Sequence, residues 1–271
     1  FAHIPIDRYH ANKRVSSSML KTFNSLGARG YQLRHLLGQY PLPQTKPMLV
    51  GQAFEDLVCG RSEPIIIEGD GRTTPVKAKK AEAEAKNEER VAEGLAPHPI
   101  FTGKGTDEVS DFMRQAHINF MKNDELTKLV GRCVEQPTLF GSYPGLPGLQ
   151  ARPDWGNTDG EFPDLKVTED LDSFMQKFVK FDYHVQAALV RRCAREMGIE
   201  KPTHMHIVAE RRVPFRVQVM DIPEELMQIG EARLERSLEE LAECYRRDEW
   251  PLCAQRTVMR VPAWMLAKKE G

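Results

Sequence analysis

The chain has 271 residues, of which 41% are hydrophobic and 28% are charged, and its formal net charge is −1. This length and apolar content are enough for one substantial hydrophobic core. No run approaches the roughly 18 apolar residues of a membrane-spanning helix, and no secretory signal is visible at the start. The near-neutral charge counts mildly against a nucleic-acid-binding protein but does not exclude one, because basic groups can gather in one groove.

The cysteines indicate a reducing compartment. They form no CxxC pair, and an odd, scattered set predicts free thiols and a cytoplasmic location. We expect each of them to act as a small apolar side chain. They are Cys59, Cys133, Cys193, Cys244 and Cys253. Because the chain begins at Phe1 and not at a methionine, we expect its natural N-terminus to lie upstream.

The first 130 residues are predicted to be mostly helical. The run Ser16-Ser17-Ser18 is typical of a helix N-cap, and helical spacing continues to Leu37 before prolines interrupt it. A second helix is expected from about Met48 to Leu57. A loop or short hairpin should follow over 60–76.

The segment 77–95 is rich in Lys, Glu and Ala, and it predicts a solvated helix or a mobile insertion. The alternative is that Lys77, Lys79 and Lys80 contact a phosphate backbone. An amphipathic helix is expected within 106–130. We regard about 60–105 as an insertion in this helical part.

Residues 131–250 alternate between strand and helix patterns and should form the core of a single domain, with 251–271 as a C-terminal tail. Together the elements predict an α/β fold, with a mixed sheet flanked by helices and an N-terminal helical region. The expected strands and helices are Cys133–Leu139, Leu149–Trp155, Phe162–Val167, about Asp172–Met197, Thr203–Glu210, Phe215–Met220 and Pro223 to about Arg247.

The strongest functional signal is Arg152-Pro153-Asp154 followed by Asp164-Leu165-Lys166. The run 155–160 between them is rich in turn formers and predicts a hairpin that brings both acids to one end of a sheet. Alternate strand residues share a face, so Asp164 and Lys166 should point the same way. Two carboxylates and a lysine suit metal-assisted phosphodiester hydrolysis. The alternative is a surface hairpin with an exposed ion pair.

Four further features lie in order around this hairpin. Glu55 follows Gly51 on a predicted helix, Glu135 lies on the preceding strand, and Tyr183 and Gln186 share a helix face at a spacing of i, i+3. The fourth feature is the serine run, which together with Lys21 forms a natural phosphate seat at a helix N-terminus. Each also has a structural interpretation, as an exposed acid, a core-boundary pair or an ordinary N-cap.

The combined order GxxxE, E, RPD, DxK, YxxQ over residues 15–250 resembles the RecB-like branch of the PD-(D/E)xK nuclease superfamily. Within that branch it is similar to the RecE (exonuclease VIII) group and to the phage lambda-type exonucleases. RecE-like members usually carry His at the position of Glu55, whereas lambda-type enzymes carry Glu. The resemblance implies a restriction-endonuclease-like core.

The resemblance also implies roles for individual residues. Lys166 would position or deprotonate the attacking water, while Glu135 would assist and Tyr183 and Gln186 would support the site. The implied ligands of Mg²⁺ or Mn²⁺ are Asp154, Asp164, Glu55 and the carbonyl oxygen of Leu165. The residues expected to contact phosphate or DNA are Ser16, Ser18, Lys21, Arg152, Lys177, Lys180, Arg191 and Arg192.

Other metal centres are not expected. Zinc is disfavoured because no Cys/His cluster has ligand spacing. His204 and His206 share a strand face, but without a third ligand nearby we interpret them as structural. The iron–sulfur variant of this branch needs a tight cysteine trio, and Cys244 and Cys253 are too far apart to belong to one.

These observations predict a metal-dependent exonuclease acting on duplex DNA ends. The resemblance implies that it acts 5′→3′ and leaves 3′ single-stranded tails for phage or prophage recombination. The resemblance implies a homo-oligomeric ring, a trimer or tetramer, a single-strand annealing protein as partner, and no membrane. Two alternatives remain: an endonuclease or repair nuclease on the same core, and a DNA-binding module without catalytic activity.

Overall fold

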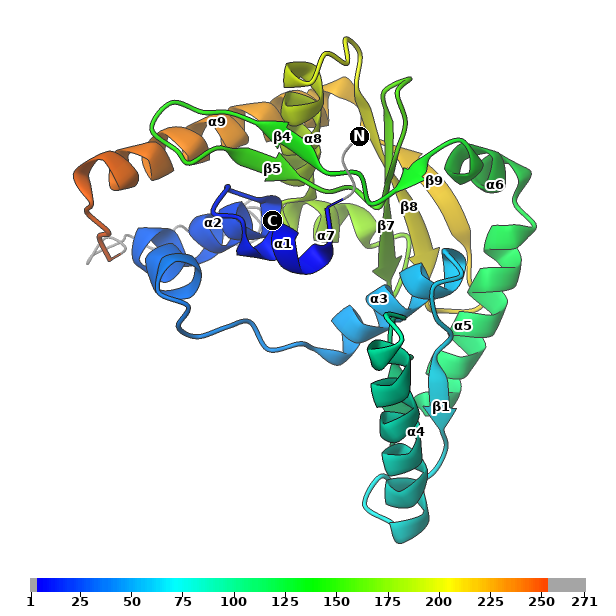
Figure 1. Ribbon diagram of the computed structural model, residues 1–271. Helices are drawn as coiled ribbons and strands as arrows, with labels where there is room; N and C mark the ends of the chain where they lie inside the picture. The colour runs from blue at the N-terminus through cyan, green and yellow to red at the C-terminus, as the bar shows by residue number, and fades with distance from the viewer. Residues whose placement is uncertain (1–3, 253–271) are drawn as a thin grey trace, which may run out of the picture.

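The computed structural model describes residues 4–252 (Figure 1). Helices dominate the N-terminal half, as the sequence predicts. Its elements are α1 (Ile6–Ala11), α2 (Ser17–Tyr31), the π-helix η1 (Gln32–Leu36), α3 (Lys46–Val58), β1 (Ile65–Ile67), α4 (Thr74–Ala92), β2 (Ile100–Thr102), α5 (Thr106–Met121) and α6 (Asp124–Gly131). In the described part of the chain, no helix is both long and apolar enough to cross a membrane.

The C-terminal half alternates strands and helices, and the predicted mixed α/β architecture is confirmed. Its elements are β3 (Val134–Glu135), β4 (Leu139–Gly141), β5 (Leu149–Ala151), β6 (Trp155–Gly156), β7 (Glu161–Thr168), α7 (Phe174–Lys180), α8 (Tyr183–Glu196), β8 (Thr203–Glu210), β9 (Val217–Asp221) and α9 (Glu224–Arg247). The expected tail 251–271 lies outside the described residues, apart from its first two.

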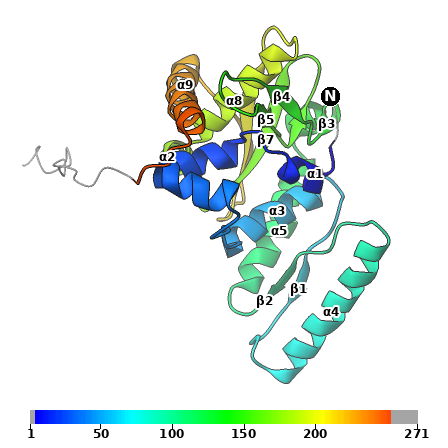
Figure 2. The same ribbon diagram turned by 60° about the vertical axis from the view of Figure 1, so that its left-hand side comes forward.

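The central sheet has the order β7-β8-β9, with β7 parallel to β8 and β9 antiparallel to it. Two hydrophobic cores cover its two faces. Phe162 packs with α2, α8 and α9, whereas Leu165 and Ile207 pack with α3 and α5. Figures 1 and 2 show α8 and α9 on one side of these strands and α3 and α5 on the other. Even-numbered residues of β7 therefore face α8.

Two expected strands and one expected helix are interrupted, and in each case the break lies next to a candidate site residue. The expected strand Leu149–Trp155 divides at Pro153, which lacks an N–H for the ladder, so that β5 pairs with β4 and β6 pairs with β3. The expected strand Cys133–Leu139 breaks at Gln136, where φ is 45°. The expected helix 172–197 breaks at Asp182, where φ is 53°.

The turn predicted between the two acids is present. Asn157 Oδ1 accepts the N–H of Glu161 at 3.0 Å, and Gly160 takes a positive φ of 94°. The strand before this turn, β6, is paired with β3 and not with β7, so the simple hairpin that we expected was wrong. The partner of β7 is β8.

The segment 60–105 projects from the rest of the molecule (Figure 2). Over 60–76, where a loop or a short hairpin was expected, loop residues flank β1. The hairpin alternative was wrong, because β1 pairs in parallel with β2, and parallel strands need a crossover. That crossover is α4, the solvated helix predicted over 77–95. Its few buried residues, Val76 and Ala83, pack on Ile67 of β1.

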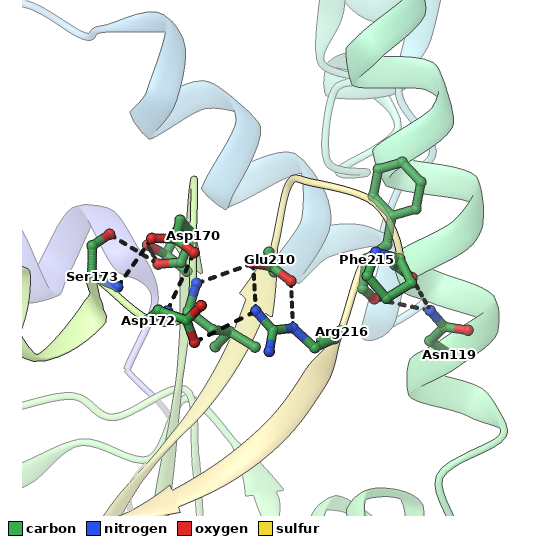
Figure 3. A network of polar contacts seen from close by, with 10 residues as sticks. Asn119, Asp170, Asp172, Ser173, Glu210, Phe215 and Arg216 are labelled. Atoms are coloured by element: carbon green, nitrogen blue, oxygen red, sulfur yellow. Dashed lines mark hydrogen bonds and ion pairs between the residues drawn. The ribbon is translucent and has the colours of Figure 1, made fainter.

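A polar network ties the far end of the sheet together (Figure 3). Glu210, at the end of β8, is 2% exposed and accepts two hydrogen bonds from Arg216, at 2.7 and 2.9 Å. It also accepts the N–H of Leu171 at 3.2 Å. Asn119 of α5 donates to the carbonyl oxygens of Pro214 and Phe215, which holds the β8–β9 connection against that helix.

Candidate active site

Strand β7 presents an acid and a lysine to the face of the sheet that α8 covers. Asp164 is 2% exposed, and Lys166 Nζ contacts its Oδ2. The same ammonium lies 3.3 Å from the carbonyl oxygen of Leu165. Burial lowers the pKa of Lys166, which makes proton release from this lysine easier than in water. The two side chains meet as strand alternation predicts.

Asp154 lies at the break between β5 and β6. Its Oδ2 accepts the N–H of Leu165 at 2.6 Å, and its carbonyl oxygen accepts the N–H of Gln136 at 2.8 Å. Burial and then the charge of Glu55 raise the pKa of Asp154 to about 7, against the opposing effects of Lys166 and the Leu165 N–H. The interrupted strand thus brings the first acid of the motif to the peptide that follows the second.

Glu55 reaches the same place from α3. Its Oε1 accepts hydrogen bonds from Arg61 and, at 2.8 Å, from Gln136 Nε2. Arg61 also binds Asp56 at 2.9 Å and Glu135 at 3.3 Å. Glu135 therefore stands at the rim with its side chain 44% exposed, and in this structure its carboxylate is held by Arg61.

Helix α8 closes the inner side of the site. Gln186 Nε2 donates to Asp164 Oδ1 at 3.0 Å, and Lys21 Nζ donates to Gln186 Oε1 at 3.0 Å. The Tyr183 ring lies 4.8 Å from Lys21 Nζ and 5.1 Å from Lys166 Nζ. Burial lowers the pKa of Lys21 to about 7, and the charge of Lys166 adds to this shift. Gln186 fixes one oxygen of Asp164 and leaves the other toward Lys166.

A cavity of about 230 Å³ adjoins Asp154. The start of α2 and the β5–β6 break line it together with Gln136, and Arg152 at the break donates to Gln136 Oε1 at 2.8 Å. Ser16 and Ser18 hydroxyls lie 3.0 Å apart at the helix N-terminus, where an anion is favoured. The lining residues are Tyr9, His10, Ser16, Ser17, Ser18, Gln136, Arg152 and Asp154.

The other basic residues expected to touch DNA lie elsewhere. Lys21 points inward to Gln186 and is not part of the serine-lined cavity. Lys177 donates to Thr168 Oγ1 at 2.8 Å, and Lys180 lies over the ring of Phe181. Arg191 pairs with Glu224 at 3.0 Å, which turns its guanidinium toward α9. Arg192 pairs in the same way with Glu235 at 2.8 Å.

Sequence reasoning missed Arg61 and Gln136, and it interpreted His204 and His206 as structural. Arg61 lies six residues after Glu55 and had no recognisable motif. The expectation that the two histidines have no third ligand nearby was wrong, because Asp164, His204 and His206 each offer a ligand atom within 4.8 Å of the others. The parallel register that pairs Asp164 with His206 is the missing information.

The donor set fits a divalent cation. Glu55, Asp154 and Asp164 supply carboxylates around the Leu165 peptide, and hard oxygen ligands are those that Mg²⁺ and Mn²⁺ prefer. The charge of Glu55 contributes to the raised pKa of Asp154, and a cation bound between them would relieve that repulsion. The carbonyl oxygen of Leu165 lies beside the same acids and can serve as a fourth donor.

Comparison with known proteins places the chain in a family and supports its fold. The family described as "PDDEXK-like domain of unknown function (DUF3799)" matches residues 16–259. A crystal structure of a candidate exonuclease from Eubacterium rectale superposes with a TM-score of 0.64 at 13% sequence identity, over 100% of both chains. At that identity the likeness establishes the fold alone. None of the curated proteins matches the chain.

A second solved structure, a phage-related exonuclease from Haemophilus somnus 129PT, matches 72% of this chain and 95% of its own. Its sequence identity is 12% and its TM-score is 0.29, which is too low to support an argument about the fold.

Proposed function

Because the chain belongs to the PDDEXK-like family, within the PD-(D/E)xK nuclease superfamily, we propose that it is a divalent-cation-dependent DNA exonuclease that hydrolyses duplex ends. One observation carries this proposal. Asp154, Asp164 and Lys166 meet at the Leu165 peptide, beside a cavity lined by the serines of α2. A surface hairpin with a solvent-exposed ion pair does not describe these residues, because Asp164 is 2% exposed.

The residues of the site divide the chemistry among them. A divalent cation held by the acids would polarise the scissile phosphate and lower the pKa of an attacking water. Lys166, whose pKa burial lowers, is placed to take a proton from that water or to hydrogen-bond the phosphate oxygen. Gln186 keeps Asp164 in one orientation, because a carboxylate fixed through one oxygen has a defined second lone-pair direction.

The serine-lined cavity supports an end-directed activity. Ser16, Ser17 and Ser18 at the start of α2 line this cavity together with Arg152 and Asp154. Such a site suits a terminal phosphate, whose charge is greater than that of an internal phosphodiester. A 5′-phosphate seated there would place the first phosphodiester near the acids. The 5′→3′ polarity of our proposal rests on this placement.

The remaining parts of the proposal follow from the resemblance to RecE and lambda-type exonucleases. They are the preference for Mg²⁺ or Mn²⁺, the 3′ single-stranded tails, the role in phage or prophage recombination, the single-strand annealing partner, and a ring of three or four copies around duplex DNA. Each stays a prediction. A closed ring would also explain how an enzyme of net charge −1 stays on its substrate.

The decisive test compares linear duplex DNA with covalently closed circular DNA. The wild type is incubated with Mg²⁺ or with EDTA, beside Asp164→Asn, Lys166→Ala and, as a control, Lys180→Ala, whose ammonium lies over Phe181. We expect Mg²⁺-dependent loss of the linear duplex alone, retained in Lys180→Ala and abolished in the other two. Labels on the 5′ or 3′ ends give the polarity.

Other outcomes separate the alternatives. Cleavage of the closed circle would reject an exonuclease in favour of an endonuclease or repair nuclease. Binding of DNA with no hydrolysis under any divalent cation would reject an enzyme in favour of the non-catalytic DNA-binding module. Release of labelled 3′ nucleotides first would contradict the proposed role of the serine-lined cavity.

A further inference from the structure

His204 and His206 are buried on the same sheet face as the candidate nuclease acids. They are 4% and 1% exposed, and the parallel register places His206 directly beside Asp164 of β7. The two rings lie 5.0 Å apart, centroid to centroid, in an edge-to-face arrangement. The pair therefore lies in the interior of the protein and not at its surface.

All four ring nitrogens of these histidines lack a hydrogen-bond partner among residues 4–252. A neutral imidazole carries one donor and one acceptor, and leaving such groups unpaired in the interior costs about 1–3 kcal/mol each. Buried polar groups in folded proteins are normally satisfied. Two adjacent imidazoles with no partner are therefore unexpected unless something else binds them.

A third ligand completes the set. Asp164 Oδ2 lies 3.7 Å from His206 Nδ1, and one ligand atom from each of the three residues lies within 4.8 Å of the other two. Each neutral imidazole has one ring nitrogen with a free lone pair, which can bind a metal ion. All three residues are held by paired strands, which makes the arrangement rigid.

We propose that Asp164, His204 and His206 form a second metal site, which takes a first-row transition ion such as Zn²⁺ or Co²⁺. Imidazole nitrogen is a ligand for such ions, whereas Mg²⁺ prefers oxygen. Two histidines and one carboxylate are a known ligand set for zinc and for non-haem iron. This site is distinct from the oxygen-rich one formed with Glu55 and Asp154, although the two share Asp164.

Lys166 opposes this second site. Its ammonium contacts Asp164 Oδ2, the oxygen that also faces His206, so lysine and metal compete for one carboxylate oxygen. Lys21 adds positive charge nearby. A transition ion should therefore bind more tightly when Lys166 is replaced by an uncharged side chain of similar length. Lys166→Met separates the two sites, because the nuclease chemistry that we assign to Lys166 would be abolished.

The test is binding of Co²⁺ alone to the full chain after chelator treatment, followed by proton NMR. A paramagnetic ion shifts the ring N–H resonances of histidines that bind it. The set of proteins comprises the wild type, His204→Gln, His206→Gln, Asp154→Asn and Lys166→Met. The matched control is His184→Gln, another buried imidazole, 3% exposed, which lies outside the cluster.

We expect shifted imidazole signals in the wild type, in Asp154→Asn and in His184→Gln. Affinity should fall at least about tenfold in His204→Gln and His206→Gln, which lack a ligand, and should rise in Lys166→Met. Circular dichroism identifies any variant that fails to fold, and the remaining variants then decide the result. Absence of shifted histidine signals in the wild type, or an unchanged Co²⁺ affinity in a folded His206→Gln, would overturn the proposal. Neither result depends on nuclease activity.

Discussion

Strand β8 carries two buried polar clusters, one at each end. One cluster is fully hydrogen-bonded, and the ring nitrogens of the other have no hydrogen-bond partner in the described chain. Near its end, Glu210 is 2% exposed and is fully engaged by Arg216 and the Leu171 N–H (Figure 3). Near its start, His204 and His206 are equally buried, and their ring nitrogens have no hydrogen-bond partner in the described chain. Burial alone therefore does not separate a structural cluster from a functional one.

A second contrast is between the pKa values of Glu210 and of Asp154, an acid of the candidate nuclease site. Hydrogen bonds from Arg216 lower the pKa of Glu210, whereas burial and the charge of Glu55 raise the pKa of Asp154 to about 7. In the first case the fold supplies partners for the charge, and in the second it adds another negative charge. A fold that holds like charges together carries a repulsion that a proton or a bound cation relieves, and such perturbed groups are common where a site performs chemistry.

The largest expected effect is on activity. Lys166→Ala should lower the rate of hydrolysis about 10²–10⁴-fold, the usual contribution of a positioned proton-transfer group. Single-turnover digestion of linear duplex measures it. Glu210→Gln, in the paired cluster, should digest DNA at nearly the wild-type rate below its melting temperature. Equal losses of hydrolysis rate in both variants would show that the contrast between the candidate nuclease site and the Glu210 cluster has no functional meaning.

The second prediction concerns stability, for which Glu210 should matter more than Asp154. Glu210→Ala should lower the free energy of unfolding by about 1–3 kcal/mol, because it leaves the Leu171 N–H without its partner. Asp154→Asn should leave the stability unchanged or raise it near pH 8, because it removes a charge that the fold disfavours. Urea unfolding followed by circular dichroism gives both values. A large loss of stability in Asp154→Asn would mean that this acid is structural.

These contrasts were only partly visible in the sequence. Strand alternation was enough to place Asp164 and Lys166 on one face, and the run Thr203–Glu210 forms the predicted strand with the same limits. The third ligand of the histidine pair was not predictable, because it depends on a parallel register between segments about 40 residues apart. Local patterns determine which face a residue takes, but pairing between distant strands determines what it meets.

The breaks in regular structure show the same limit. Positive φ has no local signal at Gln136 and only a weak one at Asp182, since neither residue is glycine and aspartate adopts this conformation more readily than glutamine. Gln136 then links Glu55 to Arg152. The divided strand around Pro153 was foreseeable in part, because proline cannot donate to a central ladder.

The third prediction concerns pH. The pKa of Asp154 is about 7 in the folded state, whereas the ordinary value of an aspartate is 3.8. Between these two pH values the folded protein therefore binds more protons than the unfolded one. The stability of the metal-free protein should therefore fall as the pH rises through this window, and Asp154→Asn should remove that part of the slope.

The affinity for a cation should change with pH in the opposite direction to the stability. A cation displaces the proton of Asp154, so affinity should rise with pH by at most about tenfold per unit until about pH 7, and then level off. Calorimetric titration of Mg²⁺ across this range, in wild type and Asp154→Asn, measures the slope. An affinity that does not change with pH would place the cation away from Asp154.

The smallest effects on the free energy of unfolding are expected from substitutions on α4, where the charged side chains are exposed and paired with one another. Lys80 pairs with Glu84 and Lys86 with Glu82, with every one of these side chains at least 50% exposed. Exposed pairs contribute little, so Lys80→Ala should change the free energy of unfolding by no more than about 0.5 kcal/mol.

The same helix tests whether exposed charge means DNA binding. If Lys77, Lys79 and Lys80 neutralise phosphates, replacing all three by Ala should reduce the slope of log affinity against log salt by about 0.9 for each phosphate that is no longer neutralised. We expect an unchanged slope, because the glutamates of α4 balance its lysines and also line the cavities described along this helix. Arg152→Ala, by contrast, should reduce the slope by about 0.9, the value for one phosphate, since its guanidinium lines the cavity beside Asp154. A reduced slope in the α4 variant alone would move the DNA path from the serine-lined cavity to the projecting segment.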